Sequence, residues 1–100
     1  MSIYWTDDEL KKSIQSYFKM LKYQKNNTPF VKAEINRELK LKIPNRSQGS
    51  IEYRWQNISS VLNDKKLPYV DGYLPAKNVG ANVKERIWKI IKDLKLIETK

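Results

Sequence analysis

Hydrophobic residues recur every three or four positions in several stretches of the chain, which is the spacing of one buried face on an α-helix. The first stretch opens with Thr6-Asp7-Asp8-Glu9, in which the Thr6 hydroxyl and the Glu9 carboxylate are spaced to form a capping box. Its apolar positions are Leu10, Ile14, Tyr17, Phe18 and Leu21. The pattern predicts a helix that runs to about Tyr23.

A second, shorter helix is expected after the polar segment that follows. Thr28 is placed to cap it, and Pro29 to occupy its first position, where the missing N–H has no partner to lose. The helix should end by Ile43, because Pro44 disfavours the α conformation in the residue before it. Its buried side is expected to consist of Phe30 or Val31, Ile35 and Leu39.

The third helix is predicted over about residues 50–63, with Ser47 or Ser50 as its cap. One side of this helix is apolar and is expected to be core: Ile51, Trp55, Ile58 and Leu62. The opposite side, which we expect to be exposed, has neutral polar residues where Lys and Glu are more usual: Tyr53, Gln56, Asn57, Ser60 and Asn63. The short connector between the second and third helices is typical of a helix-turn-helix.

Residues 67–75, Leu67-Pro68-Tyr69-Val70-Asp71-Gly72-Tyr73-Leu74-Pro75, contain two prolines and a glycine and cannot form a regular helix. Their apolar side chains predict an ordered extended segment that packs on the helices. Asn82 and Glu85 have the spacing of another capping box, which predicts a last helix ending near Lys95. The predicted fold is therefore mainly α: a helix-turn-helix-like bundle of four helices with an extended segment after helix three. We expect a single domain, residues 1–100, with its core in residues 4–96.

The composition excludes most catalytic and metal-binding chemistry. The chain has no Cys and no His, so it lacks thiolate nucleophiles and the side chains most used for zinc and for proton transfer at neutral pH. The capping box accounts for Asp7, Asp8 and Glu9 without any chemistry, and the three glycines stand too far apart for a phosphate-binding loop. We expect neither an enzyme nor a cofactor.

The charge of the chain favours a polyanionic partner. Its net charge is +9, and residues 11–46 alone hold ten basic against two acidic side chains. Lysine-rich helices that merely keep a small protein soluble are the alternative. No apolar run approaches the roughly 20 residues needed to cross a bilayer, and the opening Met1-Ser2-Ile3-Tyr4-Trp5 does not have the pattern of a signal peptide. A cytoplasmic protein without a membrane partner is therefore expected.

The exposed side of helix three has the residues that read DNA. Gln56 and Asn57 have amides that pair bidentately with adenine, and Ser60 suits either a base or a phosphate. Gln48, Ser50 and Tyr53 lie at the N-terminal end, where a phosphate also meets free backbone N–H groups. The expected phosphate contacts are Arg46, Lys32, Lys40 and Lys42.

Several of these residues have structural interpretations that the sequence leaves open. Asn57 can bond within the fold, and Arg54 can pair with Glu38 or another acid. Tyr69 and Tyr73 can pack the extended segment or stack on a base. A protein-interaction or dimerisation module, using the 53–60 face and the 67–75 segment, is the alternative to DNA binding.

Two long runs of residues resemble a known family. They are Arg46-Ser47-x-Gly49-Ser50-Ile51-Glu52-x-Arg54-x-x-Asn57-Ile58-Ser59-x-Val61-Leu62 and Leu67-Pro68-Tyr69-x-x-Gly72-Tyr73-x-Pro75. With Trp5-Thr6-x-x-Glu9-Leu10 they are similar to the N-terminal domain of McrA-like HNH restriction endonucleases, which are specific for modified DNA. The resemblance covers roughly residues 5–80. It implies DNA binding at Arg46, Ser47, Gly49, Ser50 and Asn57.

The same resemblance implies a C-terminal HNH nuclease domain, which this His-free chain does not contain. We therefore expect the targeting module of a restriction or defence nuclease that binds double-stranded DNA, whether modified or not. A weaker likeness to Myb/SANT three-helix domains rests on Trp5-Thr6-x-x-Glu9 and Arg54-Trp55-x-Asn57. The full set of expected DNA contacts is Arg46, Ser47, Gln48, Gly49, Ser50, Tyr53, Arg54, Gln56, Asn57, Ser60, Lys32, Lys40 and Lys42.

Overall fold

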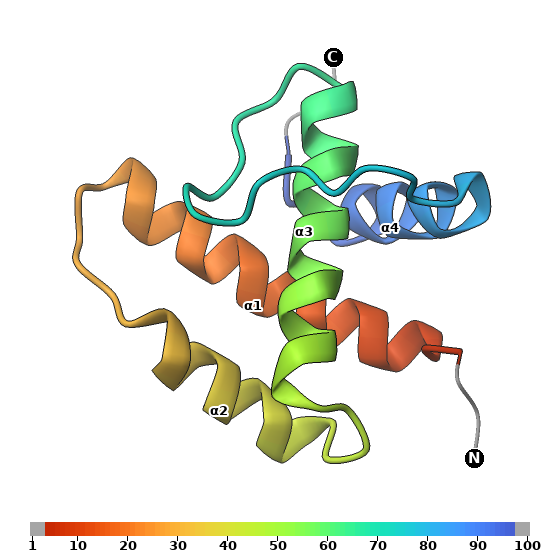
Figure 1. The fold of residues 1–100 in the computed structure, drawn as a ribbon. Helices are drawn as coiled ribbons and strands as arrows, with labels where there is room; N and C mark the ends of the chain where they lie inside the picture. The colour runs from red at the N-terminus through yellow and green to blue at the C-terminus, as the bar shows by residue number, and fades with distance from the viewer. Residues whose placement is uncertain (1–3, 98–100) are drawn as a thin grey trace.

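The computed structural model describes residues 4–97, which fold into four helices joined by turns and one long extended segment (Figure 1). The helices are α1 (Asp7–Lys25), α2 (Lys32–Lys42), α3 (Gln48–Asp64) and α4 (Ala81–Asp93). Residues 4–97 contain no strand, so the predicted mainly helical bundle is confirmed. Residues 1–3 and 98–100 of the predicted domain lie outside the described part.

Helix α1 begins where its sequence predicts a cap. The Thr6 hydroxyl accepts a hydrogen bond from the Glu9 N–H at 3.1 Å, and the Glu9 carboxylate accepts one from the Thr6 N–H at 2.9 Å. Two amides of the first turn that have no partner within a helix are thereby satisfied. Asp7, Asp8 and Glu9 also place negative charge at the positive end of the helix dipole.

Helix α2 begins three residues later than the predicted cap at Thr28 and first position at Pro29. The Thr28 N–H instead donates to the Tyr23 carbonyl at 2.8 Å, which closes the turn after α1. Phe30 then packs its ring 5.9 Å from that of Tyr23. Because these contacts hold residues 28–31 in a non-helical path, the N-cap position falls to Val31, whose side chain makes no capping bond.

One of the two caps predicted for α3 is confirmed, whereas the start of α4 differs from expectation. Ser47, rather than Ser50, caps α3, and its hydroxyl accepts from the Ser50 N–H at 3.1 Å. The predicted capping box at Asn82 is wrong: Gly80 is the N-cap of α4, so Asn82 already lies in the first turn. Helix α4 ends at Asp93, two residues before the predicted end.

Helices α1 and α3 cross at the centre of the molecule, and each packs against all three other helices. Helices α2 and α4 lie on either side and make no contact with each other within residues 4–97. The predicted core face of α3 is fully buried: Ile51, Trp55, Ile58 and Leu62. Trp55 also donates its indole N–H to the Ser13 carbonyl of α1 at 3.2 Å, so its predicted structural role is confirmed.

The segment between α3 and α4, residues 65–80, is here called the strap. It leaves the end of α3, runs beside α1 and then crosses in front of the second half of α3 (Figure 1). Val70 and Tyr73 are its buried anchors, and the Tyr73 ring meets Trp55 edge-on with centroids 5.2 Å apart. The prediction of an ordered extended segment packed on the helices is therefore confirmed.

A buried hydroxyl joins the strap to two helices. The Tyr17 hydroxyl of α1 accepts from the Val70 N–H at 2.9 Å and lies 2.7 Å from the Ser59 hydroxyl of α3. Burial raises the pKa of this phenol, more than the two hydrogen bonds lower it. Since α1, α3 and the strap all meet at this oxygen, its loss leaves two buried polar groups to find other partners.

We expect Tyr17→Phe to lower the free energy of unfolding by about 1–3 kcal/mol, because the Val70 N–H and Ser59 hydroxyl lose a buried partner. Urea denaturation of the variant and the parent chain measures this. The matched control is Tyr23→Phe, whose hydroxyl makes no hydrogen bond within residues 4–97. Equal effects of the two substitutions would show that the Tyr17 hydrogen bonds contribute nothing of their own.

Candidate nucleic-acid interface

Helix α3 is exposed at its first turns and again at its last residues, Asn63 and Asp64, whereas residues 57–62 are buried. The strap crosses this helix, and its Ala76 N–H donates to the Gln56 carbonyl at 3.2 Å. Asn57 is 2% exposed and Ser60 is 5% exposed, so the prediction that both face solvent is wrong. The spacing alone did not show that Arg54, α4 and the strap pack around this part of the helix.

Asn57 is occupied within the fold together with Arg54. The Arg54 guanidinium donates to the Asn57 amide oxygen at 2.8 Å, and it lies over the Trp5 ring, 4.9 Å from the centroid. The pairing of Arg54 with Glu38 is not formed, because Glu38 meets Lys19 instead. Burial lowers the pKa of Arg54, and Arg46 and Arg86 lower it further. The structural interpretation of Asn57 is therefore confirmed.

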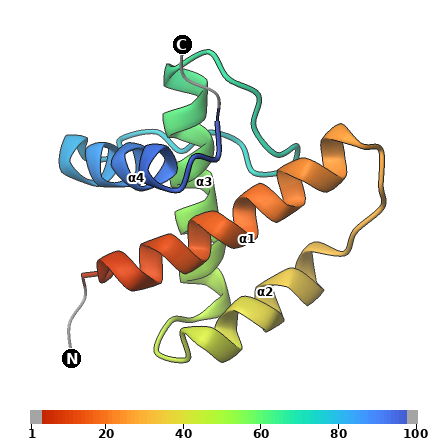
Figure 2. The same cartoon turned by 180° about the vertical axis from the view of Figure 1, so that it is seen from behind.

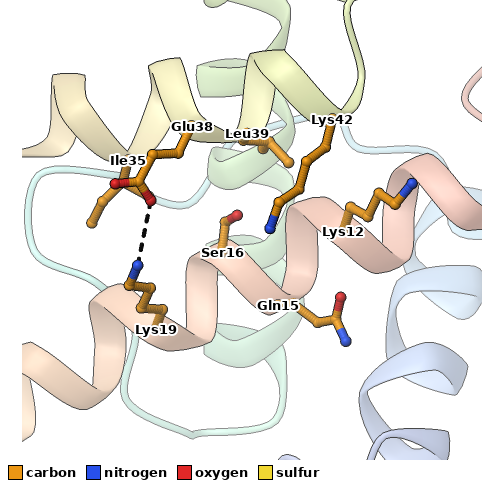
Figure 3. Close-up of a pocket in the computed structure, with 8 residues that line it drawn as sticks. All are labelled: Lys12, Gln15, Ser16, Lys19, Ile35, Glu38, Leu39 and Lys42. Atoms are coloured by element: carbon orange, nitrogen blue, oxygen red, sulfur yellow. Dashed lines mark hydrogen bonds and ion pairs between the residues drawn. The ribbon is translucent and has the colours of Figure 1, made fainter.

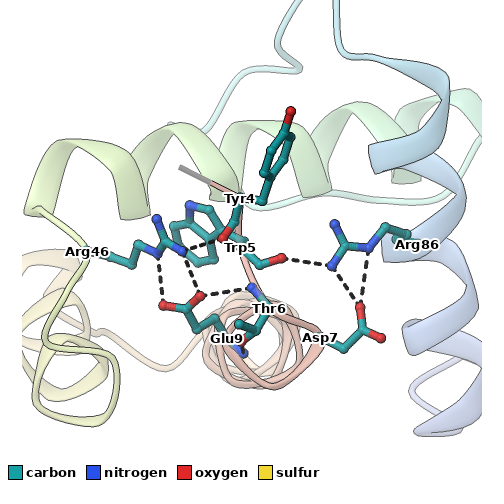
Figure 4. Close-up of polar contacts among 7 residues, drawn as sticks. All are labelled: Tyr4, Trp5, Thr6, Asp7, Glu9, Arg46 and Arg86. Atoms are coloured by element: carbon teal, nitrogen blue, oxygen red, sulfur yellow. Dashed lines mark hydrogen bonds and ion pairs between the residues drawn. The ribbon is translucent and has the colours of Figure 1, made fainter. Parts of the chain in front are cut away.

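Arg46 is tied to the start of α1. Its guanidinium donates to both carboxylate oxygens of Glu9 at 2.8 Å and to the Tyr4 carbonyl at 2.7 Å (Figure 4). It also lies over Trp5, 5.1 Å from the ring centroid. The side chains of Arg46 and Glu9 are only 13% and 14% exposed. An arginine held in this way has few free donors to offer a phosphate.

A second arginine, Arg86, binds the residues before α1 from the side opposite Arg46. Arg86 of α4 donates to the Asp7 carboxylate at 2.8 Å and to the Trp5 carbonyl at 2.8 Å (Figure 4). Sequence reasoning missed this residue, because nothing in the spacing of α4 links it to a carboxylate 79 positions away. Residues 4–9, here called the N-terminal clamp segment, are thus held between Arg46 and Arg86.

The turn into α3 and its first two turns form the accessible part of the predicted site. Gln48, Gly49 and Tyr53 are exposed, whereas Ser50 and Gln56 are partly covered. Ser47 contributes its hydroxyl to the cap. A Cβ added at Gly49 would meet no atom within 4 Å, so the fold itself leaves open space there. The structure therefore brings Ser47, Gln48, Gly49, Ser50, Tyr53 and Gln56 together at one end of α3.

The three predicted lysines lie in different surroundings. Lys32 sits over the Tyr73 ring, 5.0 Å from its centroid, and so supports the strap. Lys40 donates to the Arg46 carbonyl at 2.7 Å, which holds its ammonium group beside the turn into α3. Lys42 is exposed and makes no hydrogen bond or ion pair within residues 4–97. It lines a groove between α1 and α2 with Lys12 and Lys19, which sequence reasoning did not single out.

Other kinds of site find no support in the described residues. In residues 4–97 no three acidic side chains gather in a way that could hold a metal ion. None of the four helices has the length and apolar character needed to cross a bilayer. No family model, curated protein or solved structure matches this chain. The function must therefore be inferred from the surfaces themselves.

The Glu9–Arg46 pair gives the fold a defined response to acid. The hydrogen bonds from Arg46 lower the pKa of the Glu9 carboxyl from 4.5 to about 2, against the opposing effect of burial. A carboxyl whose pKa is lower in the folded state stabilises the fold above its unfolded pKa. That contribution is lost as the pH falls from about 4.5 towards 2.

We expect Glu9→Gln to lower the free energy of unfolding at pH 7 by about 1–3 kcal/mol, since Arg46 loses its carboxylate partner, while the Gln amide oxygen can still accept the capping bond from the Thr6 N–H. The difference between variant and parent should shrink as the pH falls from 5 to 2. Thermal melts across that range measure it. Glu85→Gln, an exposed glutamate on α4, is the matched control; a constant difference at every pH would contradict this account.

Proposed function

We propose that this chain binds double-stranded DNA, with the uncovered first half of α3 placed in the major groove. The most direct support comes from the N-terminal turns of α3. There Gln48, Tyr53 and Gln56 offer hydrogen-bonding side chains beside open space at Gly49. In helix-turn-helix proteins the N-terminal residues of the second helix are those that contact base edges. The covering of Asn57 and Ser60 therefore removes only the far half of the predicted reading surface.

The turn before α3 suits a phosphate. The first amides of a helix have no partner within it, and the positive end of the helix dipole attracts anions. Ser47 satisfies the Ser50 N–H, so the amides of Gln48 and Gly49 are the ones presented at this end. The Lys40 ammonium, held beside the turn by the Arg46 carbonyl, adds positive charge.

The residues that distinguish one DNA sequence from another need not be those that provide most of the affinity. Glu52 lies on the exposed part of α3 and repels phosphates, although a glutamate can accept from cytosine N4. With Arg46 and Arg86 paired to carboxylates, electrostatic attraction must come mainly from the lysines of this +9 chain. The role as targeting module of a restriction nuclease rests on the residue resemblance alone and forms part of this proposal.

Protein interaction is the second candidate function, because two large side chains near the reading surface are exposed. Tyr53 of α3 is 51% exposed and Leu74 of the strap is 67% exposed. Both belong to the regions that the alternative interpretation assigns to docking. Asn57 and Ser60 of the same 53–60 face are buried and Gln56 is partly covered, which leaves the docking surface smaller than expected.

We expect the chain to bind a 20-base-pair duplex with an affinity that falls steeply as salt rises, because neutralised phosphates release counterions. Fluorescence anisotropy at several ionic strengths, between roughly 50 and 200 mM, measures the slope. Gln48→Ala should reduce the discrimination between sequences by about 1–3 kcal/mol while non-specific binding survives. A concentration-dependent dimer in sedimentation, with no duplex binding at low salt, would favour the protein-interaction function instead.

Gly49→Ala separates folding from binding at the same position. The added methyl group meets nothing in the free chain, and alanine loses less conformational entropy than glycine in a helix. Thermal stability should therefore rise, by up to about 1 kcal/mol. Duplex affinity should fall if a DNA backbone approaches this turn. Gly80→Ala, at the start of α4, is the control that should leave duplex affinity unchanged.

A further inference from the structure

A groove lies between α1 and α2, and α3 is in the background of the view that shows its lining (Figure 3). Its volume is about 280 Å³. The lining consists of Lys12, Gln15, Ser16 and Lys19 from α1, and Ile35, Glu38, Leu39 and Lys42 from α2. Three ammonium groups thus border a groove that has one carboxylate in its wall.

The charges of the groove are only partly balanced. Lys12 pairs with Asp8 one turn earlier at 2.9 Å, and Lys19 meets Glu38 across the groove at 3.4 Å. The Lys19–Glu38 pair has side chains 47% and 61% exposed, so it contributes little and yields readily to a stronger anion. Lys42 has no partner within residues 4–97, and its ammonium group points into the groove towards Ser16 (Figure 3).

The groove offers hydrogen bonds and charge but no apolar anchor. Ile35 and Leu39 form its floor, yet they are 5% and 1% exposed, so little apolar surface is left for a protein partner to cover. Stable protein interfaces rely on a buried apolar centre with aromatic or arginine anchors. Phosphate groups need what this groove has, namely cations and neutral donors spread along a line.

We propose that the α1–α2 groove binds the phosphodiester backbone of a nucleic acid. It would be a second contact surface, separate from the N-terminal turns of α3. Lys12, Lys19 and Lys42 neutralise successive phosphates, and Gln15 and Ser16 donate between them. This inference rests on the proposed function only in taking nucleic acid as the ligand. The residues involved are different and lie on another face of the molecule.

The length of the groove limits how this ligand can lie. Lys12 and Lys19 are seven positions apart on one helix, which corresponds to about 10 Å along its axis. Because a strand winds around the duplex axis, neighbouring phosphates lie farther apart than the axial rise of about 3.4 Å per nucleotide. A strand that follows the groove therefore places more than one phosphate near its lysines only if it runs along the full length between Lys12 and Lys19.

A surface on each side lets one chain touch two segments of nucleic acid. Helix α3 passes in front of α1 in Figure 1, and α1 passes in front of α3 in Figure 2. The groove would contact a different stretch of nucleic-acid backbone from the first turns of α3 and supply attraction that those turns, with their Glu52, lack.

The test changes charge in the groove in both directions. Lys42→Gln should weaken binding of a 20-base-pair duplex about threefold or more near 100 mM salt, and reduce the slope of log affinity against log salt by about 0.9. Glu38→Gln removes the only carboxylate in the groove lining and frees Lys19, so it should tighten binding by about twofold or more. Lys89→Gln and Glu85→Gln make the same charge changes at exposed positions of α4.

Four outcomes decide the proposal. Groove variants that shift affinity in opposite directions, with the α4 controls near the parent value, support it. Equal shifts in groove and control variants show a diffuse effect of net charge and overturn it. Groove variants that bind duplex like the parent also overturn it and leave an acidic protein segment as the ligand, while duplex binding at α3 stands. A parent chain that binds no duplex at low salt overturns this inference together with the proposed function.

Discussion

The bidentate pair between Glu9 and Arg46 is the interaction on which the arrangement of this fold depends. Glu9 closes the capping box of α1 and at the same time accepts both donors of Arg46, which lies in the turn between α2 and α3. The Glu9 carboxylate therefore helps to fix both the start of α1 and the position of the turn from which α3 begins. Arg86 adds α4 through Asp7 and the Trp5 carbonyl, so three helices converge on the N-terminal clamp segment. Burying the charges of Glu9 and Arg46 is tolerated because each is the hydrogen-bonded partner of the other, whereas Asp7 and Arg86 keep more contact with solvent.

The strap has the opposite effect, because it restricts what α3 can present. Its anchors Val70 and Tyr73 are buried, and the Tyr17 hydroxyl bonds its backbone. A segment fixed by core residues is not a lid that opens at low cost. Residues 57–62 of α3 are consequently part of the interior, and the larger accessible part of this helix is its N-terminal end, next to the turn from α2. That end is also the one whose direction the Glu9–Arg46 pair sets.

Local signals allowed most of the fold to be predicted from sequence. The capping box at Thr6 and the apolar stripe of α3 depend only on neighbours within a few residues, and both are present. The predictions failed at positions whose structure depends on residues far away in the sequence. Thr28 closes the turn after α1 instead of capping α2, and Asn57 is buried beside Arg54, whose position over the distant Trp5 ring no local pattern gives. Arg46 looked free for phosphate, because its partner Glu9 stands 37 positions earlier.

The basic residues of the chain lie elsewhere in the fold than their order in the sequence suggests. Sequence order puts the basic residues 11–46 immediately before α3, which suggests that they surround it. In the fold, part of that charge lies in the α1–α2 groove, on the far side of the helices that α3 packs against. These lysines are close to α3 in sequence but separated from it in space, because α1 and α2 each bury one face against α3 and turn their lysines outward. Under the proposed function, the lysines of the groove would attract the nucleic acid and the first turns of α3 would contact its bases, on two surfaces that share one core.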